Sequence, residues 1–208
     1  MYCCQVPRTA PAAVRLALIE RAAAMLAARE PVTLRGLVAG TGVSTMAVYT
    51  HFDGMPGLWR AVRQEGFVRM LARFDAVPRT TDAVRDLAAL GASYQAHARE
   101  QPDLYRVMFD DSYGLDDAVV PDATFDTLVD AAARAVADGR FDAACAPRDL
   151  ATRYWAFLHG LAMLRLGLVL DADALPGHAR ALSDALFIDA GDDPARCRAS
   201  VLAGWAGG

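Results

Sequence analysis

The chain has 208 residues, of which 54% are hydrophobic and 8% aromatic, and its formal net charge is −4. This length allows one large or two small domains, and the composition fits a globular, all-helical protein. All 21 basic residues are arginine, which excludes any site that requires a lysine, such as a Walker phosphate loop.

The charge is distributed unevenly along the chain. Residues 1–75 contain nine arginines and five acidic residues, whereas residues 76–208 contain twelve arginines and twenty acidic residues. A basic amino-terminal module joined to an acidic body is typical of a protein that binds a polyanion at one end only.

The first elements in chain order are a leader and a helix. Residues 1–11 are expected to form a loose leader, and no positively charged start precedes an apolar run, as it would in a signal peptide. Arg8 and Arg15 could contact phosphates or simply remain solvated. A helix is predicted over residues 12–29, and Glu30-Pro31 ends it because the residue before a proline disfavours helical geometry.

Residues 33–52, TLRGLVAGTGVSTMAVYTHF, predict two short helices joined by a tight turn. Thr33 is the expected amino-terminal cap of the first helix, and Ser44 that of the second. Gly40 is expected to stop the first helix in left-handed geometry.

The second of these helices has two different faces. Val48 and Phe52 are expected to face a small core with Val43, while the opposite face has no apolar reason to be buried. It carries hydroxyls, a thioether and a phenol, from Thr45, Met46, Tyr49 and Thr50. A short helix of this kind after a glycine-containing turn predicts a helix-turn-helix whose second helix enters the DNA major groove.

The rest of the chain predicts further helices and no lasting strand pattern. Pro56 suits the first turn of a long helix at 57–77. Later helices are expected at 82–100, capped by Thr81 or Asp82, and then at 101–109, 122–138, 147–170 and 174–188. The tail that contains Trp205 has no assigned structure.

The most apolar run of the sequence covers residues 154–170. It is short for a membrane span and contains His159 and Arg165, so we expect a buried helix at a subunit interface and no membrane association.

Two sets of residues resemble a known family. Gly42-Val43-Ser44, Tyr49 and His51-Phe52 closely resemble, at this spacing, the DNA-binding domain of the tetracycline-repressor (TetR) family, over about residues 14–74. The segment HARE-QPDLYRVMF, followed by Trp155 and His159-Gly160, resembles the WHG-type carboxy-terminal domain of that family, over about residues 82–170. The chain departs from the family at Met55-Pro56, where a lysine commonly meets a DNA phosphate.

The resemblance implies an architecture and a function. An all-α chain is expected, with a three-helix helix-turn-helix domain at 10–56 and a helical ligand-binding and dimerisation domain at 57–208, whose core covers about 82–188. The implied protein is a cytoplasmic, ligand-responsive repressor that binds a palindromic DNA operator as a homodimer and is released by a small hydrophobic ligand. Helices 147–170 and 174–188 are expected to form the dimer, and their surplus apolar surface gives an independent reason.

The resemblance also implies two sets of site residues. The DNA-binding set is Thr33, Ser44, Thr45, Met46, Ala47, Tyr49, Thr50 and His51, with His51 either contacting a phosphate or only packing the turn. The ligand-binding set is Tyr94, Tyr105, Met108, Phe109, Phe125, Trp155, His159 and Met163. By default these large side chains are core residues, and His159 is either a hydrogen-bonded core histidine or a ligand contact.

Other functions find little support in the residues. Neither a G-x-S-x-G elbow nor an H-E-x-x-H zinc pair occurs, and the four cysteines lack zinc-finger spacing, so we expect no catalytic site, metal or cofactor. Reduced cysteines fit a cytoplasmic protein. The main alternative is a helical small-molecule-binding or scaffold protein that has lost DNA reading, which the missing lysine favours slightly.

Overall fold

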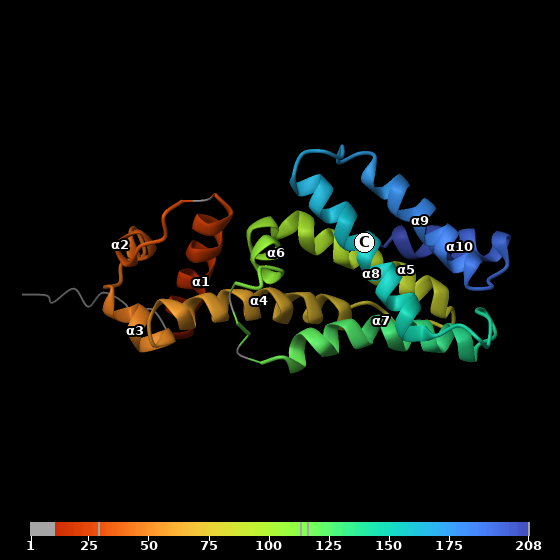
Figure 1. Cartoon of the computed structure of the whole chain (residues 1–208), viewed down its shortest axis with the longest axis horizontal. Helices are drawn as coiled ribbons and strands as arrows, with labels where there is room; N and C mark the ends of the chain where they lie inside the picture. Colours follow the sequence, from red (N-terminus) through yellow and green to blue (C-terminus); the bar gives the residue numbers. More distant parts are fainter. Residues whose placement is uncertain (1–10, 29, 113, 116, 208) are drawn as a thin grey trace, which may run out of the picture. The chain divides into compact units, whose positions relative to one another are not determined.

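The computed structural model describes residues 11–28, 30–112, 114–115 and 117–207. These residues form ten α-helices and no β-strand, which confirms the all-α prediction (Figure 1). By contact, the chain divides into a first unit, within 1–66 and 103–117, and a second unit, within 67–102 and 118–208. The sequence analysis predicts a domain boundary at residue 56, which does not coincide with this division by contact. That boundary stays a prediction.

The first unit contains α1 (Pro11–Ala27), α2 (Leu34–Val38), α3 (Met46–Phe52), the part of α4 (Met55–Asp75) up to Gly66, and α6 (Pro102–Met108) from its second residue. Leu18 and Ile19 of α1 are fully buried together with Leu37, Val48 and Leu58. Leu104 and Val107 of α6 belong to the same core. A segment far along the chain therefore completes the core of the helix-turn-helix unit.

Two close contacts fix α6 on α4 within the first unit. A Cβ at Gly66 would overlap the side chain of Met108, so only glycine permits this approach. The Arg63 Nε donates a hydrogen bond to the Met108 carbonyl at 2.9 Å.

The second unit contains the end of α4, α5 (Ala83–Glu100), α7 (Val119–Ala137), α8 (Pro147–Leu166), α9 (Leu175–Asp189) and α10 (Pro194–Trp205). Helix α5 is its centre, because α7, α8 and α10 all pack against it (Figure 1). Small residues allow this crowding: a Cβ at Gly91 would overlap the Tyr154 hydroxyl of α8, and a Cβ at Gly204 would overlap the backbone of α5.

Asp82, the second of the two caps proposed from the sequence, begins α5. Its Oδ1 accepts hydrogen bonds from the amides of Val84 at 3.2 Å and Arg85 at 3.1 Å. A buried ionic network surrounds it, since Arg140 donates to Asp82 at 2.7 Å and to both carboxylate oxygens of Asp192 at 2.7 and 2.8 Å. Burial alone would raise the pKa of Asp82. Hydrogen bonds from Ser200 and Arg85 and the charge of Arg140 outweigh burial, so this pKa lies below its ordinary value.

Helix α10 was not expected from the sequence, which left the tail around Trp205 unassigned. Asp193 caps it by accepting from the amides of Ala195 at 3.0 Å and Arg196 at 2.8 Å, and Pro194 occupies its first turn. The buried Cys197 and Val201, four residues apart, carry its inner face. The Asp193-Pro194 pair is a sequence signal for the start of a helix. The small residues between 194 and 205 hid the apolar periodicity that would have indicated the helix itself.

Two helix bounds differ from the prediction for clear reasons. Helix α8 ends at Leu166 rather than 170, because the Gly167 amide closes the last turn on the Met163 carbonyl at 2.9 Å and Leu168 turns to a φ of 59°. Helix α7 begins at Val119 rather than 122, since Pro121 is tolerated in a first helical turn. Among the described helices, none has both the length and the hydropathy needed to cross a membrane.

Candidate functional site

The turn before α3 is built as the sequence predicted. The Thr33 hydroxyl accepts from the Gly36 amide at 3.1 Å and so caps α2, and α2 ends at Val38. Gly40 and Gly42 take positive φ angles of 76° and 73°, which disfavour any other residue. The Thr41 hydroxyl donates to the Val38 carbonyl at 2.7 Å and ties the turn to the end of α2.

The start of α3 corrects one expectation. Ser44 does not cap it: the helix begins at Met46, Thr45 takes the cap position, and no side chain makes a capping hydrogen bond. The carbonyl of Ser44 instead accepts from the Ala47 amide at 2.9 Å. The first turn of α3 therefore leaves the hydroxyls of Ser44 and Thr45 without a capping role.

One face of α3 is open to solvent. Met46 and Tyr49 are 64% and 51% exposed, and Thr50 is also exposed. These positions lie three and four residues apart, so their side chains share one face. Val48 and Phe52 are buried on the other side, as predicted, while Ala47 is half-buried against the core and thus less open than Met46, Tyr49 and Thr50. The exposed face offers a phenol, a thioether and a threonine hydroxyl.

A basic pocket of about 360 Å³ lies at the carboxy-terminal end of that face. Its lining includes Arg15 from α1, Tyr49 and His51 from α3, Arg60 from α4, and one carboxylate, Asp53. The Arg15 guanidinium also lies 5.4 Å from the ring centre of Phe52, within cation–π range, which holds it beside α3. Cations and hydroxyl groups from three helices can together hold a phosphate group.

Arg60 was not predicted from the sequence as a phosphate contact, because only the start of α4 was considered for that role. It follows Met55-Pro56 by about one helical turn. The presence of a basic residue near the start of the helix was therefore the sequence feature that could have predicted this phosphate contact. His51 lines the pocket and its ring lies 6.2 Å from that of Phe52, so its two alternative roles, a phosphate contact and packing of the turn, both stay predictions.

The predicted ligand residues are divided between the two units. Tyr94, Phe125, Trp155 and His159 meet in the second unit and are called the Tyr94 cluster below. Tyr105, Met108 and Phe109 belong to the first unit, where Tyr105 and Met108 are fully buried. Met163 lies on the surface of α8 and is 43% exposed.

The Tyr94 cluster contains a chain of hydrogen bonds. The Trp155 indole N–H donates to the Tyr94 hydroxyl at 3.2 Å, and that hydroxyl lies 3.2 Å from Nδ1 of His159. The hydroxyl and Nδ1 can each donate or accept, so the tautomer of His159 sets the direction of this second hydrogen bond. Burial lowers the pKa of His159, which favours the neutral imidazole. Phe125 packs edge-on against Trp155 with ring centres 6.1 Å apart.

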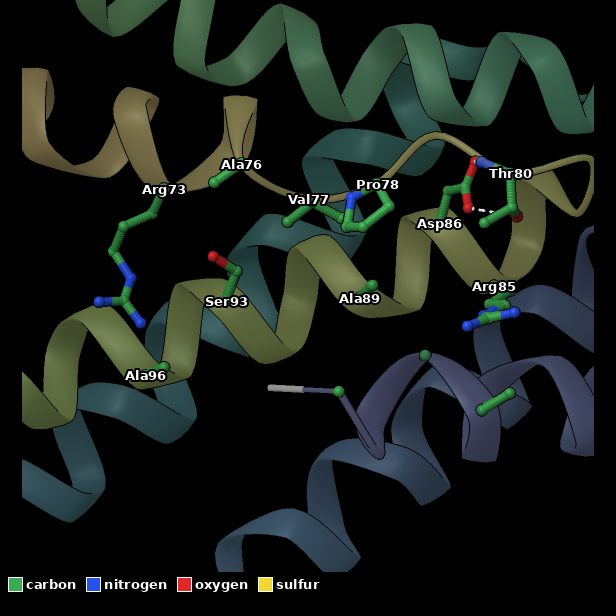
Figure 2. Close-up of a pocket in the computed structure, with 13 residues that line it drawn as sticks. Arg73, Ala76, Val77, Pro78, Thr80, Arg85, Asp86, Ala89, Ser93 and Ala96 are labelled. Carbon is green, nitrogen blue, oxygen red and sulfur yellow. Dashed lines mark hydrogen bonds between the residues drawn. The ribbon is translucent and has the colours of Figure 1, made fainter.

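A separate groove of about 470 Å³ lies in the second unit between residues 76–80, α5 and α10 (Figure 2). Its floor is Ala89, Ser93 and Ala96. Asp86 accepts a hydrogen bond from the Thr80 hydroxyl at 2.6 Å (Figure 2). It also accepts one from Arg134 at 2.8 Å, so this carboxylate of the groove is already paired within the protein.

Metal and thiol chemistry find no centre in the described part of the chain. No three His, Cys, Asp or Glu residues there are placed to hold a metal ion. Cys197 is buried, and burial raises the pKa of its thiol to about 12, which makes it unreactive. Arg8, Cys3 and Cys4 lie outside the described residues.

Comparison with known proteins identifies the relatives of this fold. A protein of unknown function from Rhodococcus sp. RHA1 is 24% identical, with a TM-score of 0.74 over 91% of this chain and 100% of its own. PfmR, a TetR-family transcriptional regulator from Thermus thermophilus, is 17% identical, with a TM-score of 0.69 over 82% of this chain and 97% of its own. SmeT, in a complex with triclosan, is 18% identical, with a TM-score of 0.64 over 85% of this chain and 91% of its own. At these identities, the structures establish the fold.

The family is established by the sequence itself. No curated protein matches the chain significantly. The family profile described as tetracyclin repressor-like, C-terminal domain, matches residues 87–190, which are half of the chain. Together with the helix-turn-helix in the first unit, this match shows that the chain belongs to the TetR family of DNA-binding transcriptional regulators.

Proposed function

We propose that the protein is a repressor that binds a palindromic operator as a homodimer and leaves it when a small hydrophobic ligand binds. The observation that carries this proposal is the exposed face of α3, bordered by the basic pocket of Arg15, His51 and Arg60. Met46, Tyr49 and Thr50 contact base edges, and the basic pocket holds a backbone phosphate. Base contacts then give specificity, and phosphate contacts give position and affinity.

Arg60 takes the place of the family lysine in this proposal. It lines the same pocket as His51 and Tyr49, so the loss of a lysine at Met55-Pro56 does not remove positive charge from this end of α3. This placement argues against the rival scaffold function, for which no basic pocket beside an exposed α3 face is needed.

The test of DNA reading begins with selection of bound sequences from a random duplex library. Operator affinity is then measured by fluorescence anisotropy for wild type and for the Thr45→Ala, Tyr49→Ala double variant. Removing a base contact costs about 1–3 kcal/mol, so a loss of about tenfold or more is expected. Thr152→Ala, an exposed threonine of the second unit, is the control and should bind normally. Equal affinity for all three proteins would exclude this reading face.

The phosphate role has a separate signature. Arg60→Gln should weaken binding similarly for all sequences and lower the slope of log affinity against log salt by about 0.9 for each phosphate that is no longer neutralised. A changed sequence preference with an unchanged slope would instead assign Arg60 to base reading. Arg148→Gln is the control, because Arg148 lies on the exposed surface of the second unit.

The ligand is proposed to act through the Tyr94 cluster. It joins α5, α7 and α8 through aromatic rings and a neutral histidine, which suits an organic ligand with few polar groups. SmeT, with its bound triclosan, shows that this fold can accommodate an organic ligand. Ligand affinity should differ with and without operator by about 1–3 kcal/mol of coupling, because a ligand shifts DNA binding only by favouring one conformation. A ligand that binds equally well in both cases is no inducer.

A further inference from the structure

The second unit has another pocket, of about 300 Å³, that contains no residue of the Tyr94 cluster. It is called the Gln95 pocket here. Helix α5 contributes Gln95 and Arg99, the end of α8 contributes Arg165, and α10 contributes Trp205. Leu175 and Pro176 at the start of α9 and alanines of α5 provide its apolar wall. We propose that the Gln95 pocket binds a small organic carboxylate that also carries a hydroxyl group.

Two buried polar atoms of opposite character lack partners at this pocket. Gln95 is only 6% exposed, and among the described residues its Oε1 has no hydrogen-bond partner. The Trp205 Nε1 is equally shielded and equally unpartnered within the described part of the chain. A buried polar group left unpaired costs about 1–3 kcal/mol, and such groups are rare in folded proteins. A ligand that both donates and accepts hydrogen bonds would satisfy both atoms.

The orientation of the Gln95 amide follows from its other contact. Its Nε2 donates to the Leu158 carbonyl at 2.6 Å. The reverse orientation would place two acceptor oxygens at that distance, so Oε1 must be the free atom. Two side chains of the pocket lining therefore each carry one polar atom that is unpaired among the residues that the structure describes, an acceptor on Gln95 that would select a hydroxyl donor and an indole donor on Trp205 that would select a ligand oxygen.

The charge of the lining selects an anion. Arg99 and Arg165 are accompanied by a single carboxylate, Asp173, among the described lining residues. Arg99 has an exposed ion pair with its neighbour Glu100 at 3.1 Å, which is a weak competitor in water. Arginine favours carboxylates because its guanidinium can donate two parallel hydrogen bonds. The volume and the apolar wall fit a small organic acid and not a long chain.

Isothermal titration calorimetry of the full chain tests the proposal with para-hydroxybenzoate and lactate as probes. Saturable binding of at least one probe at millimolar concentration is expected. Benzoate, which lacks the hydroxyl group, and para-hydroxybenzamide, which lacks the charge, should each bind about tenfold more weakly than para-hydroxybenzoate. Absence of saturable binding for both probes, or equal affinity for para-hydroxybenzoate and benzoate, would overturn the proposal.

Two variants place the binding in this pocket. Trp205→Phe removes only the indole donor, and Arg165→Gln removes a charge from the surface end of α8, so each should weaken the bound probe about tenfold or more. Trp155→Phe, in the Tyr94 cluster, and Arg198→Gln, on the exposed side of α10, are the matched controls and should bind normally. A loss confined to Trp155→Phe would assign the binding to the Tyr94 cluster and overturn the proposal. Thermal unfolding confirms that each variant is folded, and either variant alone decides the outcome.

Discussion

At the scale of single residues, His97 is a titratable group that folding removes from water. It is fully buried on α5, and burial, reinforced by the charges of Arg73 and Arg69, lowers its pKa from 6.5 to about 4. The folded protein therefore keeps His97 neutral over a pH range in which the unfolded chain takes up a proton.

This difference predicts how stability depends on pH. Between pH 6.5 and about 4 the unfolded state binds more protons than the folded state, so the free energy of unfolding decreases as the pH falls. From pH 8 to pH 5 the contribution of His97 to that loss should be about 2 kcal/mol. The measurement is urea unfolding of wild type and His97→Gln at both pH values, and the variant should lose about 2 kcal/mol less.

His178→Gln is the matched control, since it removes a histidine that is exposed on α9 instead of a buried one. The pKa values of the carboxylates Asp82 and Glu100 are also lowered, and because wild type and variant share both groups, the comparison isolates His97. A His97→Gln protein with the same pH dependence as wild type would contradict this explanation.

At the scale of elements, the Arg140 network connects the start of α5, the α7–α8 loop and α10. Arg140 and Asp192 are both almost fully buried and form a two-point ion pair, while Ser200 donates to Asp82 at 2.6 Å. Removing one partner of a buried pair leaves an uncompensated charge. Arg140→Ala should therefore lower the free energy of unfolding by about 3–5 kcal/mol.

The control for Arg140 is an exposed pair in the same unit. Arg148 and Asp126 are more than half exposed and lie 3.0 Å apart, so Arg148→Ala should cost less than about 1 kcal/mol. Chemical denaturation of both variants measures the contrast. Similar losses for the two would show that Arg140 contributes no more than a surface ion pair.

The junction of α3 and α4 depends on one glycine. A Cβ at Gly57 would overlap the carbonyl oxygen of Phe52, a backbone atom that has no freedom to move aside. Gly57→Ala should shift α3 and cost about 1–3 kcal/mol of stability, together with loss of operator affinity. Gly177→Ala in α9 meets nothing within 4 Å and should be neutral or slightly stabilising in thermal unfolding. Normal operator binding by Gly57→Ala would contradict a tight junction.

At the scale of the whole molecule, the outer surfaces of α8 and α9 bear on the proposed homodimer. Met163, Leu164 and Leu182 are between 41% and 46% exposed, and Leu168 is 93% exposed. Exposed apolar side chains on these two helices and just after α8 favour association with a second copy, which would remove them from water. A dimer also gives a helix-turn-helix the two half-sites that a palindromic operator needs.

Leu164→Asp should convert a dimer to a monomer and weaken operator binding without loss of helical content. Light scattering after size-exclusion chromatography gives the mass, and circular dichroism checks the fold. Leu202→Asp, at a 57% exposed leucine of α10, is the control for charge and should remain dimeric. Leu161 would be a poor test, because it is only 8% exposed and a charge there disturbs folding. A wild-type monomer at micromolar concentration that binds its operator fully would refute the dimer.

Several local features could be predicted from the amino-acid sequence alone, because they depend on neighbouring residues. Thr33 as a cap, the left-handed Gly40, and Val48 opposite Tyr49 all follow from backbone preference and helical period, which act within a few residues. The family resemblance was readable for the same reason, because its motifs lie in short segments with fixed spacing.

Which distant residues meet became clear only in the folded chain. Folding joins α6 to the first-unit core, makes Tyr105 part of that unit, and brings Arg60 beside His51. Folding also packs α10 against α5, and a glycine is required at position 204 because the α5 backbone approaches it there. Such contacts depend on how helices of similar composition pack against one another, and a single sequence contains no local signal for that choice.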